Sequence, residues 1–241
     1  MSGHSKWATT KRAKAVVDAK KGAIFTRIAN LITISAREKG GDPNVNFMLR
    51  MAIDKAKQAN MPKDNIERAI KRGTGELAGA EISEIYYEGF GPANSQFIVK
   101  SLTDNKNRSA SNIRHIFTKN GGNLGSVTWN FSQKGVILVA NEELKTKGAN
   151  LDELELELID SGIDDFIKEE EGVTVITPVG NLQKVKEFLE KKSLNVESAQ
   201  IEYVPKEKQN PTGEEKAKIE KFIEELDDSE DVSDYYTNAN I

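Results

Sequence analysis

From residue 136 to residue 204 the chain reads VILVANEELKTKGANLDELELELIDSGIDDFIKEEEGVTVITPVGNLQKVKEFLEKKSLNVESAQIEYV. Short runs of β-branched residues, which are typical of strands, alternate here with segments whose apolar residues recur every three or four positions, as in helices. Their order predicts strand, helix, strand, strand, helix and strand, which is the ferredoxin-like arrangement. The predicted elements are Val136–Ala140, Leu151–Ser161, a strand around Phe166, Val173–Thr177, Leu182–Lys192 and Val196–Val204.

The residues on both sides of this stretch form a second α/β pattern that is split in two. The part before it lacks a closing helix and strand, and the part after it supplies one of each. We therefore predict that one α/β unit is interrupted by another. The predicted elements are a strand around Tyr86, a strand over Gln96–Thr103, a helix capped by Asn107 or Ser109 that ends at Gly121, a strand in which Val127, Trp129 and Phe131 alternate, a connection over Ser132–Gly135, a helix over Glu214–Asp227 and a strand over Val232–Thr237.

The first part of the chain has helical spacing throughout. A helix is expected over Lys11–Lys20, and a second follows a break at Gly22 and ends at Gly40. Asp42 and Pro43 form a typical N-cap and first helical residue for a third helix. A fourth is expected to start at Pro62–Asp64 and to stop at Gly73.

Together these patterns predict an α+β protein of three domains. A helical domain would occupy residues 1–78. A discontinuous α/β domain would take residues 79–134 and 205–241, and a third α/β domain over residues 135–204 would be inserted in it. We expect both α/β domains to be ferredoxin-like. A chain of 241 residues is long enough for two or three domains of ordinary size.

Charge is distributed very unevenly along the chain. Residues 1–75 contain 16 Lys and Arg against 6 Asp and Glu, a net charge of +10, whereas residues 76–241 contain 18 against 32, a net charge of −14. A concentrated positive field attracts polyanions, and neutralisation of phosphates by Lys and Arg dominates affinity for nucleic acids. The asymmetry therefore favours nucleic-acid binding, with well-solvated helix surfaces as the alternative explanation.

Composition excludes several classes of site. The chain contains no cysteine, which rules out disulfides, zinc–thiolate sites and thiol nucleophiles. Its two histidines, His4 and His115, are about 110 residues apart, and we expect no metal site and no cofactor. No triad order, Walker loop or dinucleotide motif is present, so we do not expect an enzyme or a small-molecule substrate. The polar N-terminus lacks a secretory signal and no apolar run could span a bilayer, so we expect a cytoplasmic protein without membrane contact.

The N-terminal cations are the main candidates for contact with nucleic acid. Cations can neutralise phosphates, and the indole of Trp7 can stack on a base. For Trp7, an equal alternative is that it folds back onto the helical domain. The candidates in this region are Lys6, Trp7, Lys11, Arg12, Lys14, Lys20, Lys21 and Arg27.

A second candidate lies between a predicted strand and a predicted helix. The segment Leu102–Arg108 places Lys106 and Arg108 near a helix N-terminus, where free backbone N–H groups can bind an anion such as phosphate. A polar connection with capping side chains explains the same residues, and the residues alone favour that explanation.

Several short motifs together resemble the YebC-type family. They run through nearly the whole chain and comprise Gly3–Ala8 (GHSKWA), Asp18–Gly22 (DAKKG), Ile24–Thr26 (IFT), Gly40–Pro43 (GGDP), Ala59–Asp64 (ANMPKD), Ile66–Ile70 (IERAI), Tyr87–Pro92 (YEGFGP), Leu102–Arg108 (LTDNKNR) and Asn120–Gly125 (NGGNLG). The family includes bacterial transcriptional regulators and a mitochondrial translational activator of cytochrome c oxidase. The resemblance implies a helical N-terminal domain, two α/β domains and a non-enzymatic role in gene expression through nucleic acid or the ribosome.

We therefore expect a DNA-binding transcriptional regulator that contacts mainly phosphates. No helix with Arg, Asn or Gln aimed at base edges stands out in the sequence, so binding should depend little on base sequence. The alternative is a ribosome-associated translation factor that binds ribosomal RNA through its basic N-terminal domain.

Overall fold

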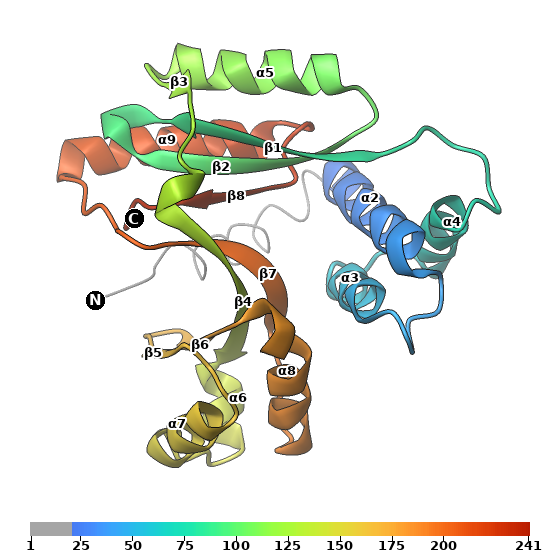
Figure 1. The fold of residues 1–241 in the computed structure, drawn as a ribbon, viewed down its shortest axis with the longest axis vertical. Helices are drawn as coiled ribbons and strands as arrows, with labels where there is room; N and C mark the ends of the chain where they lie inside the picture. The colour runs from blue at the N-terminus through green and yellow to red at the C-terminus, as the bar shows by residue number, and fades with distance from the viewer. Residues whose placement is uncertain (1–20) are drawn as a thin grey trace.

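The computed structural model describes residues 21–241, so the predicted helix over Lys11–Lys20 lies outside the described residues. The described chain forms a bundle of three helices and two four-stranded antiparallel sheets, each built around its own hydrophobic core. Figure 1 shows the bundle lying beside both sheets, with one sheet above the other. None of the helices within residues 21–241 is long and apolar enough to cross a membrane.

The helical bundle consists of α2 (Lys21–Lys39), α3 (Phe47–Gln58) and α4 (Lys63–Gly73). Ile32, Leu49 and Ala56 are fully buried in its core, and the Lys and Arg side chains lie outside it. At the end of α4, Gly73 permits close contact with α2, because a Cβ there would lie 2.4 Å from the Thr33 carbonyl oxygen. The sequence predicted this packing of apolar faces correctly.

Two helix starts in the bundle differ from the prediction. Gly22 does not break the chain, since it lies inside α2. The third helix begins at Phe47, and its N-cap is Asn46 instead of Asp42. Asn46 is buried and more fully bonded: its side chain accepts a hydrogen bond from the Leu49 amide and donates to the carbonyls of Ser35 and Gly40.

The second sheet has the predicted ferredoxin-like order of elements. Its antiparallel strands lie in the order β5-β6-β4-β7, and Ile137, Val175 and Leu189 are fully buried between the sheet and its helices. A short helix that was not predicted, α6, precedes α7. The elements are β4 (Phe131–Ala140), α6 (Asn141–Thr146), α7 (Leu151–Asp160), β5 (Asp165–Lys168), β6 (Gly172–Thr177), α8 (Leu182–Lys191) and β7 (Ser198–Pro205).

Strand β4 begins earlier than predicted. The predicted connection Ser132–Gly135 is part of the strand, because residues 131–138 pair continuously with residues 205–198 of β7. The predicted strand through Val127 and Trp129 is wrong, since residues 128–130 form a turn of 3₁₀ helix. The expected domain boundary at residue 134 therefore falls inside a strand.

The first sheet differs in order from the ferredoxin-like prediction. Its first two strands, β1 and β2, form a hairpin around a turn at Pro92–Asn94, where a ferredoxin-like unit would have a helix. The strands lie in the antiparallel order β3-β1-β2-β8, and β8 comes from the C-terminal tail. The elements are β1 (Ser83–Phe90), β2 (Gln96–Thr103), α5 (Lys106–Lys119), β3 (Asn123–Leu124), α9 (Gly213–Asp228) and β8 (Asp234–Thr237).

Both faces of the first sheet are covered. Phe97 packs with Phe117 of α5 and Phe222 of α9 in a core on one face. On the other face, Tyr203 of the second sheet contacts Tyr86 and Tyr236, with ring centroids 5.4 and 5.5 Å apart. The two sheets are therefore joined by an aromatic contact as well as by the chain.

The helical bundle contacts both sheets. At one end, the Asn30 side chain of α2 donates to the Leu102 carbonyl at 3.1 Å. At the other, Phe47 and Met51 of α3 pack against the core of the second sheet, and Lys186 of α8 pairs with Asp54 at 3.5 Å. The bundle thus fills the angle between the sheets, as Figure 1 shows.

The chain leaves the first sheet at Asn130 and returns to it at Glu207, to which Asn130 is hydrogen-bonded. The Asn130 side chain is buried and donates to the Gln96 side-chain oxygen at 2.6 Å and to the Glu207 carbonyl at 3.0 Å. Its oxygen accepts a hydrogen bond from the Glu207 amide at 2.9 Å, and its own carbonyl accepts one from the Lys206 amide at 2.7 Å. One side chain therefore links the outgoing strand, the returning strand and β2.

We predict that Asn130→Ala lowers the free energy of unfolding by about 2 kcal/mol, because the buried Gln96 side chain and the partly buried backbone of Glu207 lose their hydrogen bonds. Urea unfolding measures this loss. Asn107→Ala, at an exposed position on α5, is the control and should change stability by less than about 0.5 kcal/mol. Equal stability of both variants would contradict the role of Asn130.

Candidate nucleic-acid interface

The structure describes the side chains of three of the ten candidate residues. Lys6, Trp7, Lys11, Arg12, Lys14 and Lys20 lie outside residues 21–241. Lys21 is the first residue of α2. The three described side chains belong to Arg27, Lys106 and Arg108, and they lie on two different helices, α2 and α5.

Arg27 lies at the contact between the bundle and the first-sheet domain, where its side chain is hydrogen-bonded. Its guanidinium donates to the carbonyl oxygens of Asp227 and Ser229, at 2.8 and 2.6 Å, where α9 ends. Burial lowers the pKa of Arg27 below its ordinary value, and the nearby Asp227 partly offsets this effect. A cation at a helix C-terminus satisfies free carbonyls and stabilises the helix dipole.

Arg108 is also held within the protein. The structure shows that α5 starts at Lys106 with Asn105 as its N-cap, so neither Asn107 nor Ser109 caps it. Arg108 lies in the first turn and pairs with the buried Asp231 at 3.0 Å and with Asp104 at 3.2 Å. The hydrogen bond that Arg108 donates to Asp231, together with the negative charge of Asp231, raises the pKa of Arg108.

Groups of the protein itself already bind at the N-terminus of α5. The Asn105 side chain accepts a hydrogen bond from the Arg108 amide, which occupies one of the N–H groups that could bind an anion. Arg108 shares its charge between two carboxylates, whereas Lys106 is an exposed cation in the same turn. A phosphate at this position would have to compete with Asp104 and Asp231.

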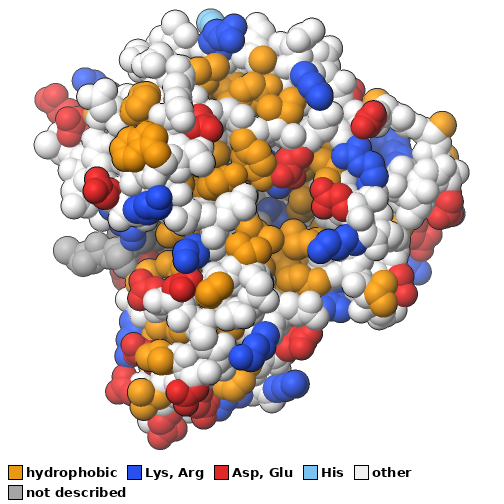
Figure 2. Space-filling view, in the orientation of Figure 1, with side chains coloured by type: hydrophobic (Ala, Val, Ile, Leu, Met, Phe, Trp, Pro, Cys, Tyr) orange, Lys and Arg blue, Asp and Glu red, His pale blue; other side chains and the backbone are white. Residues whose placement is uncertain are grey.

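The structure brings together cations that the sequence did not single out. The C-terminal ends of α2 and α4 meet beside the linker that joins α4 to β1, residues 74–82, and form a hollow of about 340 Å³. Arg37 and Arg72 line it, and Thr33 forms part of its wall. Figure 2 shows Lys and Arg side chains in this recess beside the linker, with acidic side chains at its edge.

The hollow has accessible positive charge. Arg37 has 40% of its side chain exposed and contacts the more exposed Glu81 at 3.6 Å, which is a weak surface pair. Within residues 21–241, Arg72 forms no ion pair with another described residue, and its side chain is exposed. Lys39 and Lys71 stand in the last turns of the same two helices. We call the recess that Arg37 and Arg72 line the arginine hollow.

The sequence offered only a weak signal for the arginine hollow. Lys71 and Arg72 are adjacent and precede a glycine-containing linker, but Arg37 is 35 positions away. Cations in the last turn of a helix are also explained by the helix dipole. Only the close packing of α2 on α4 at Gly73 places the two arginines at one recess.

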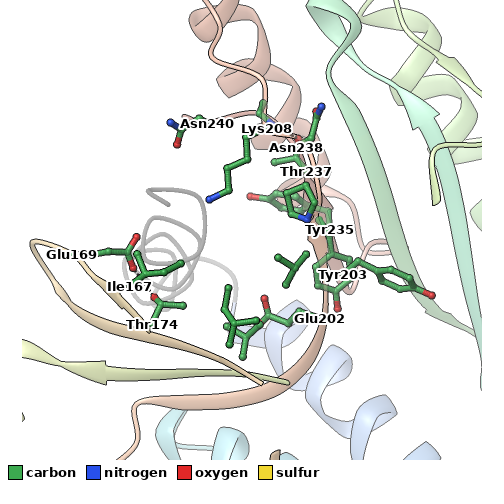
Figure 3. A pocket seen from close by; sticks show the side chains of 16 residues that line it. Ile167, Glu169, Thr174, Glu202, Tyr203, Lys208, Tyr235, Thr237, Asn238 and Asn240 are labelled. Carbon is green, nitrogen blue, oxygen red and sulfur yellow. Dashed lines mark hydrogen bonds between the residues drawn. The ribbon is translucent and has the colours of Figure 1, made fainter. Parts of the chain in front are cut away.

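A separate cavity lies between the two sheets. It encloses about 100 Å³, below the range typical of small-molecule sites. Figure 3 shows Glu169, Glu202 and Lys208 projecting toward it, with Tyr203 and Tyr235 forming part of its wall. In the part of the chain that the structure describes, no group of three or more His, Asp or Glu side chains could hold a metal ion.

Two family models match the chain. The model described as TACO1/YebC protein N-terminal domain matches residues 5–76, and the model described as TACO1/YebC second and third domain matches residues 82–239. The matched ranges meet at the linker that borders the arginine hollow.

Named relatives match over their full length. A probable transcriptional regulatory protein of Thermoanaerobacter pseudethanolicus is 48% identical, with 100% of this chain and 98% of the relative covered. A protein of the same name from Thermotoga maritima is 44% identical over 99% of this chain and 93% of the relative. The crystal structure of a conserved hypothetical protein from Aquifex aeolicus has a TM-score of 0.84 and 39% identity, covering 94% of this chain and 93% of that one.

We predict that Arg27→Met lowers the free energy of unfolding by about 2 kcal/mol, because two carbonyls at the end of α9 lose a charged donor. It should leave the salt dependence of nucleic-acid binding unchanged. Thermal unfolding and binding titrations at several salt concentrations measure both effects. A stable variant with a flatter salt dependence would instead place Arg27 on the binding surface.

Proposed function

Since the chain belongs to the TACO1/YebC family, we propose that it is a non-enzymatic regulator of gene expression that binds nucleic acid. Binding would occur mainly through phosphates, at the basic residues of the N-terminal part. The observation that carries the proposal is the separation of charge, with a net +10 over residues 1–75 and −14 over the rest. Such a molecule orients its basic end toward a polyanion before contact is made.

The proposed contacts come from two groups of residues. The first group is the N-terminal set Lys6, Trp7, Lys11, Arg12, Lys14, Lys20 and Lys21. The second is the arginine hollow, where Arg37 and Arg72 offer planar guanidinium groups that suit phosphate oxygens. Lys106 is retained as a peripheral contact, whereas Arg27 and Arg108 are assigned mainly to the fold by their hydrogen bonds.

The names of the relatives favour DNA as the partner, and we propose transcriptional regulation as the first candidate. The cations of the arginine hollow stand at helix ends instead of along one helix face, so they suit backbone phosphates better than base edges. Little dependence on base sequence is therefore expected. The proposed location is the cytoplasm.

The acidity of the rest of the chain favours a second candidate, a translation factor on the ribosome. An extended DNA duplex would repel a body with a net charge of −14, unless that body pointed away from it. A ribosome offers RNA phosphates to the basic end and basic protein surfaces to the acidic one. In this version the partner is ribosomal RNA.

We propose a three-domain division with boundaries adjusted to the strands. The domains would cover residues 1–78, residues 79–130 with 206–241, and residues 131–205. Residues 131–138 of β4 pair continuously with β7, which supports moving the domain boundary from residue 134 to Asn130.

We predict that Arg37→Ala combined with Arg72→Ala reduces the slope of log K against log salt by about two, because two phosphate contacts are lost. Fluorescence anisotropy with a labelled duplex and a labelled structured RNA measures the slope. The control is Lys145→Ala with Lys191→Ala, which removes the same charge from exposed positions on the second-sheet helices. Equal slopes in both double variants would remove the arginine hollow from the interface.

Sedimentation of the full-length protein from cell lysate separates the two candidates. We expect it to migrate with a nucleic acid, and high salt should release it, because the contacts are to phosphates. Release by DNase alone would support the transcriptional candidate. Migration with ribosomes that RNase abolishes and DNase does not would support the translational one, and migration as a free protein at low salt would contradict both.

A further inference from the structure

Trp129 is displayed on the surface by a short turn. The turn of 3₁₀ helix over Thr128–Asn130 joins β3 to β4, and Trp129 is 61% exposed. This segment lies on the side of the molecule away from α3 and α4 (Figure 1). Exposing a large indole to water is unfavourable, and the core of neither sheet includes it.

The turn is fixed in place by Glu88 of β1. One carboxylate oxygen of Glu88 accepts hydrogen bonds from the amides of Val127 and Thr128, at 2.7 and 2.8 Å, and from the Ser126 hydroxyl at 3.2 Å. Partial burial alone would raise the pKa of Glu88, but these hydrogen bonds outweigh it and the pKa lies below its ordinary value. The carboxylate therefore stays charged and bonded at neutral pH.

The other side of the turn is fixed just as firmly. Asn130 is held by Gln96 and Glu207, as described above. The Lys206 ammonium donates to the Trp129 carbonyl at 2.8 Å, which holds a cation at the backbone of the residue that carries the indole. The indole N–H donates to the Ser126 carbonyl at 3.3 Å, so the ring edge is bound while much of the ring is open to solvent. Both the backbone and the ring are positioned before any ligand arrives.

The surroundings of the indole suit an unpaired base better than a protein surface. Protein hot spots are typically surrounded by further apolar contacts that exclude water. Trp129 is instead flanked by Ser126, Thr128 and Lys206, and the remaining large exposed hydrophobic residues of the described chain belong to other elements. A planar base can stack on an indole, and a cation nearby can attract its phosphate.

We propose that Trp129 is a stacking platform for an unpaired nucleobase, with Lys206 beside it for the adjoining phosphate. The inference rests on the proposed function and adds to it a second contact, distant from the arginine hollow. A nucleic acid that contacts both the arginine hollow and Trp129 would have single-stranded or looped regions. The ligand class is single-stranded nucleic acid, RNA or DNA.

Binding of fluorescein-labelled oligonucleotides to the full-length protein tests the platform, with oligo(U), oligo(dT) and a duplex as separate arms. Trp129→Ala should weaken binding of the single strands by roughly 5- to 150-fold, which is the usual effect of removing an aromatic side chain on which one base stacks. The duplex, whose bases are paired, should be bound as by the parent. The slope of log K against log salt should not change, because no cation is lost.

Two further variants make the result specific. Trp129→Phe should keep most of the affinity, since a phenyl ring still stacks. Leu156→Ala is the matched control, because Leu156 on α7 is 65% exposed and its loss removes a similar apolar surface elsewhere. Thermal unfolding should be the same for all three variants within a few degrees.

The arms separate the possible outcomes. If Trp129→Ala loses affinity for both single strands, the indole stacks on the base regardless of the sugar. If it loses affinity for oligo(U) alone, the ligand is RNA. Either result supports the platform. Parent-like binding of single strands by Trp129→Ala, or equal loss on the duplex, would overturn it. If the parent binds none of the three probes, the proposed function fails with it, which distinguishes that failure from failure of the platform alone.

Discussion

The structure depends on the hydrogen bonds of a single buried side chain, Asn130. The chain leaves the first sheet there, builds the whole second sheet, and returns at Glu207, which Asn130 binds at both its amide and its carbonyl. The same two passages are also joined by the pairing of β4 with β7 and by the hydrogen bond from the Lys206 ammonium to the Trp129 carbonyl. The same residue ends the turn that displays Trp129, so the geometry of the crossing and the exposure of the indole have one cause.

The limits of prediction from the sequence are physical. The second sheet was predicted almost element by element, because its strands and helices are local and their hydrophobic spacing is distinct. The start of β4 was missed because Ser132–Gly135 is polar, and its strand conformation comes from pairing with residues 201–204 of β7. Trp129 was predicted to lie on a strand because Val127, Trp129 and Phe131 alternate along the sequence. That alternation does not reveal that Glu88 binds the amides of Val127 and Thr128 and bends the backbone there. In the first sheet, the two consecutive strands around Tyr86 and over Gln96–Thr103 were predicted and form the β1–β2 hairpin, but the ferredoxin-like expectation was wrong because that arrangement needs a helix between them.

The candidate site shows a similar division. Counting cations locates the basic part of the chain correctly, but it cannot tell which cations the fold uses. Arg27 binds the Asp227 carbonyl and Arg108 binds the Asp231 carboxylate, and each of these partners lies more than 100 residues away in sequence. Arg37 and Arg72, which carry no motif, become neighbours only because Gly73 lets α4 approach α2. Partners that are remote in sequence thus decide whether a given cation remains available to a phosphate.

Nucleic acid is proposed to contact the basic part of the chain and the turn that carries Trp129, and to avoid the acidic helices α7 and α9. Ultraviolet cross-linking in cells, followed by mass spectrometry of the cross-linked peptides, tests this proposal most directly because it reports contacts without a chosen probe. We expect cross-links within residues 1–78 and at the turn that carries Trp129, and none on the acidic helices α7 and α9. Cross-links concentrated on α7 or α9, with none in residues 1–78, would contradict it.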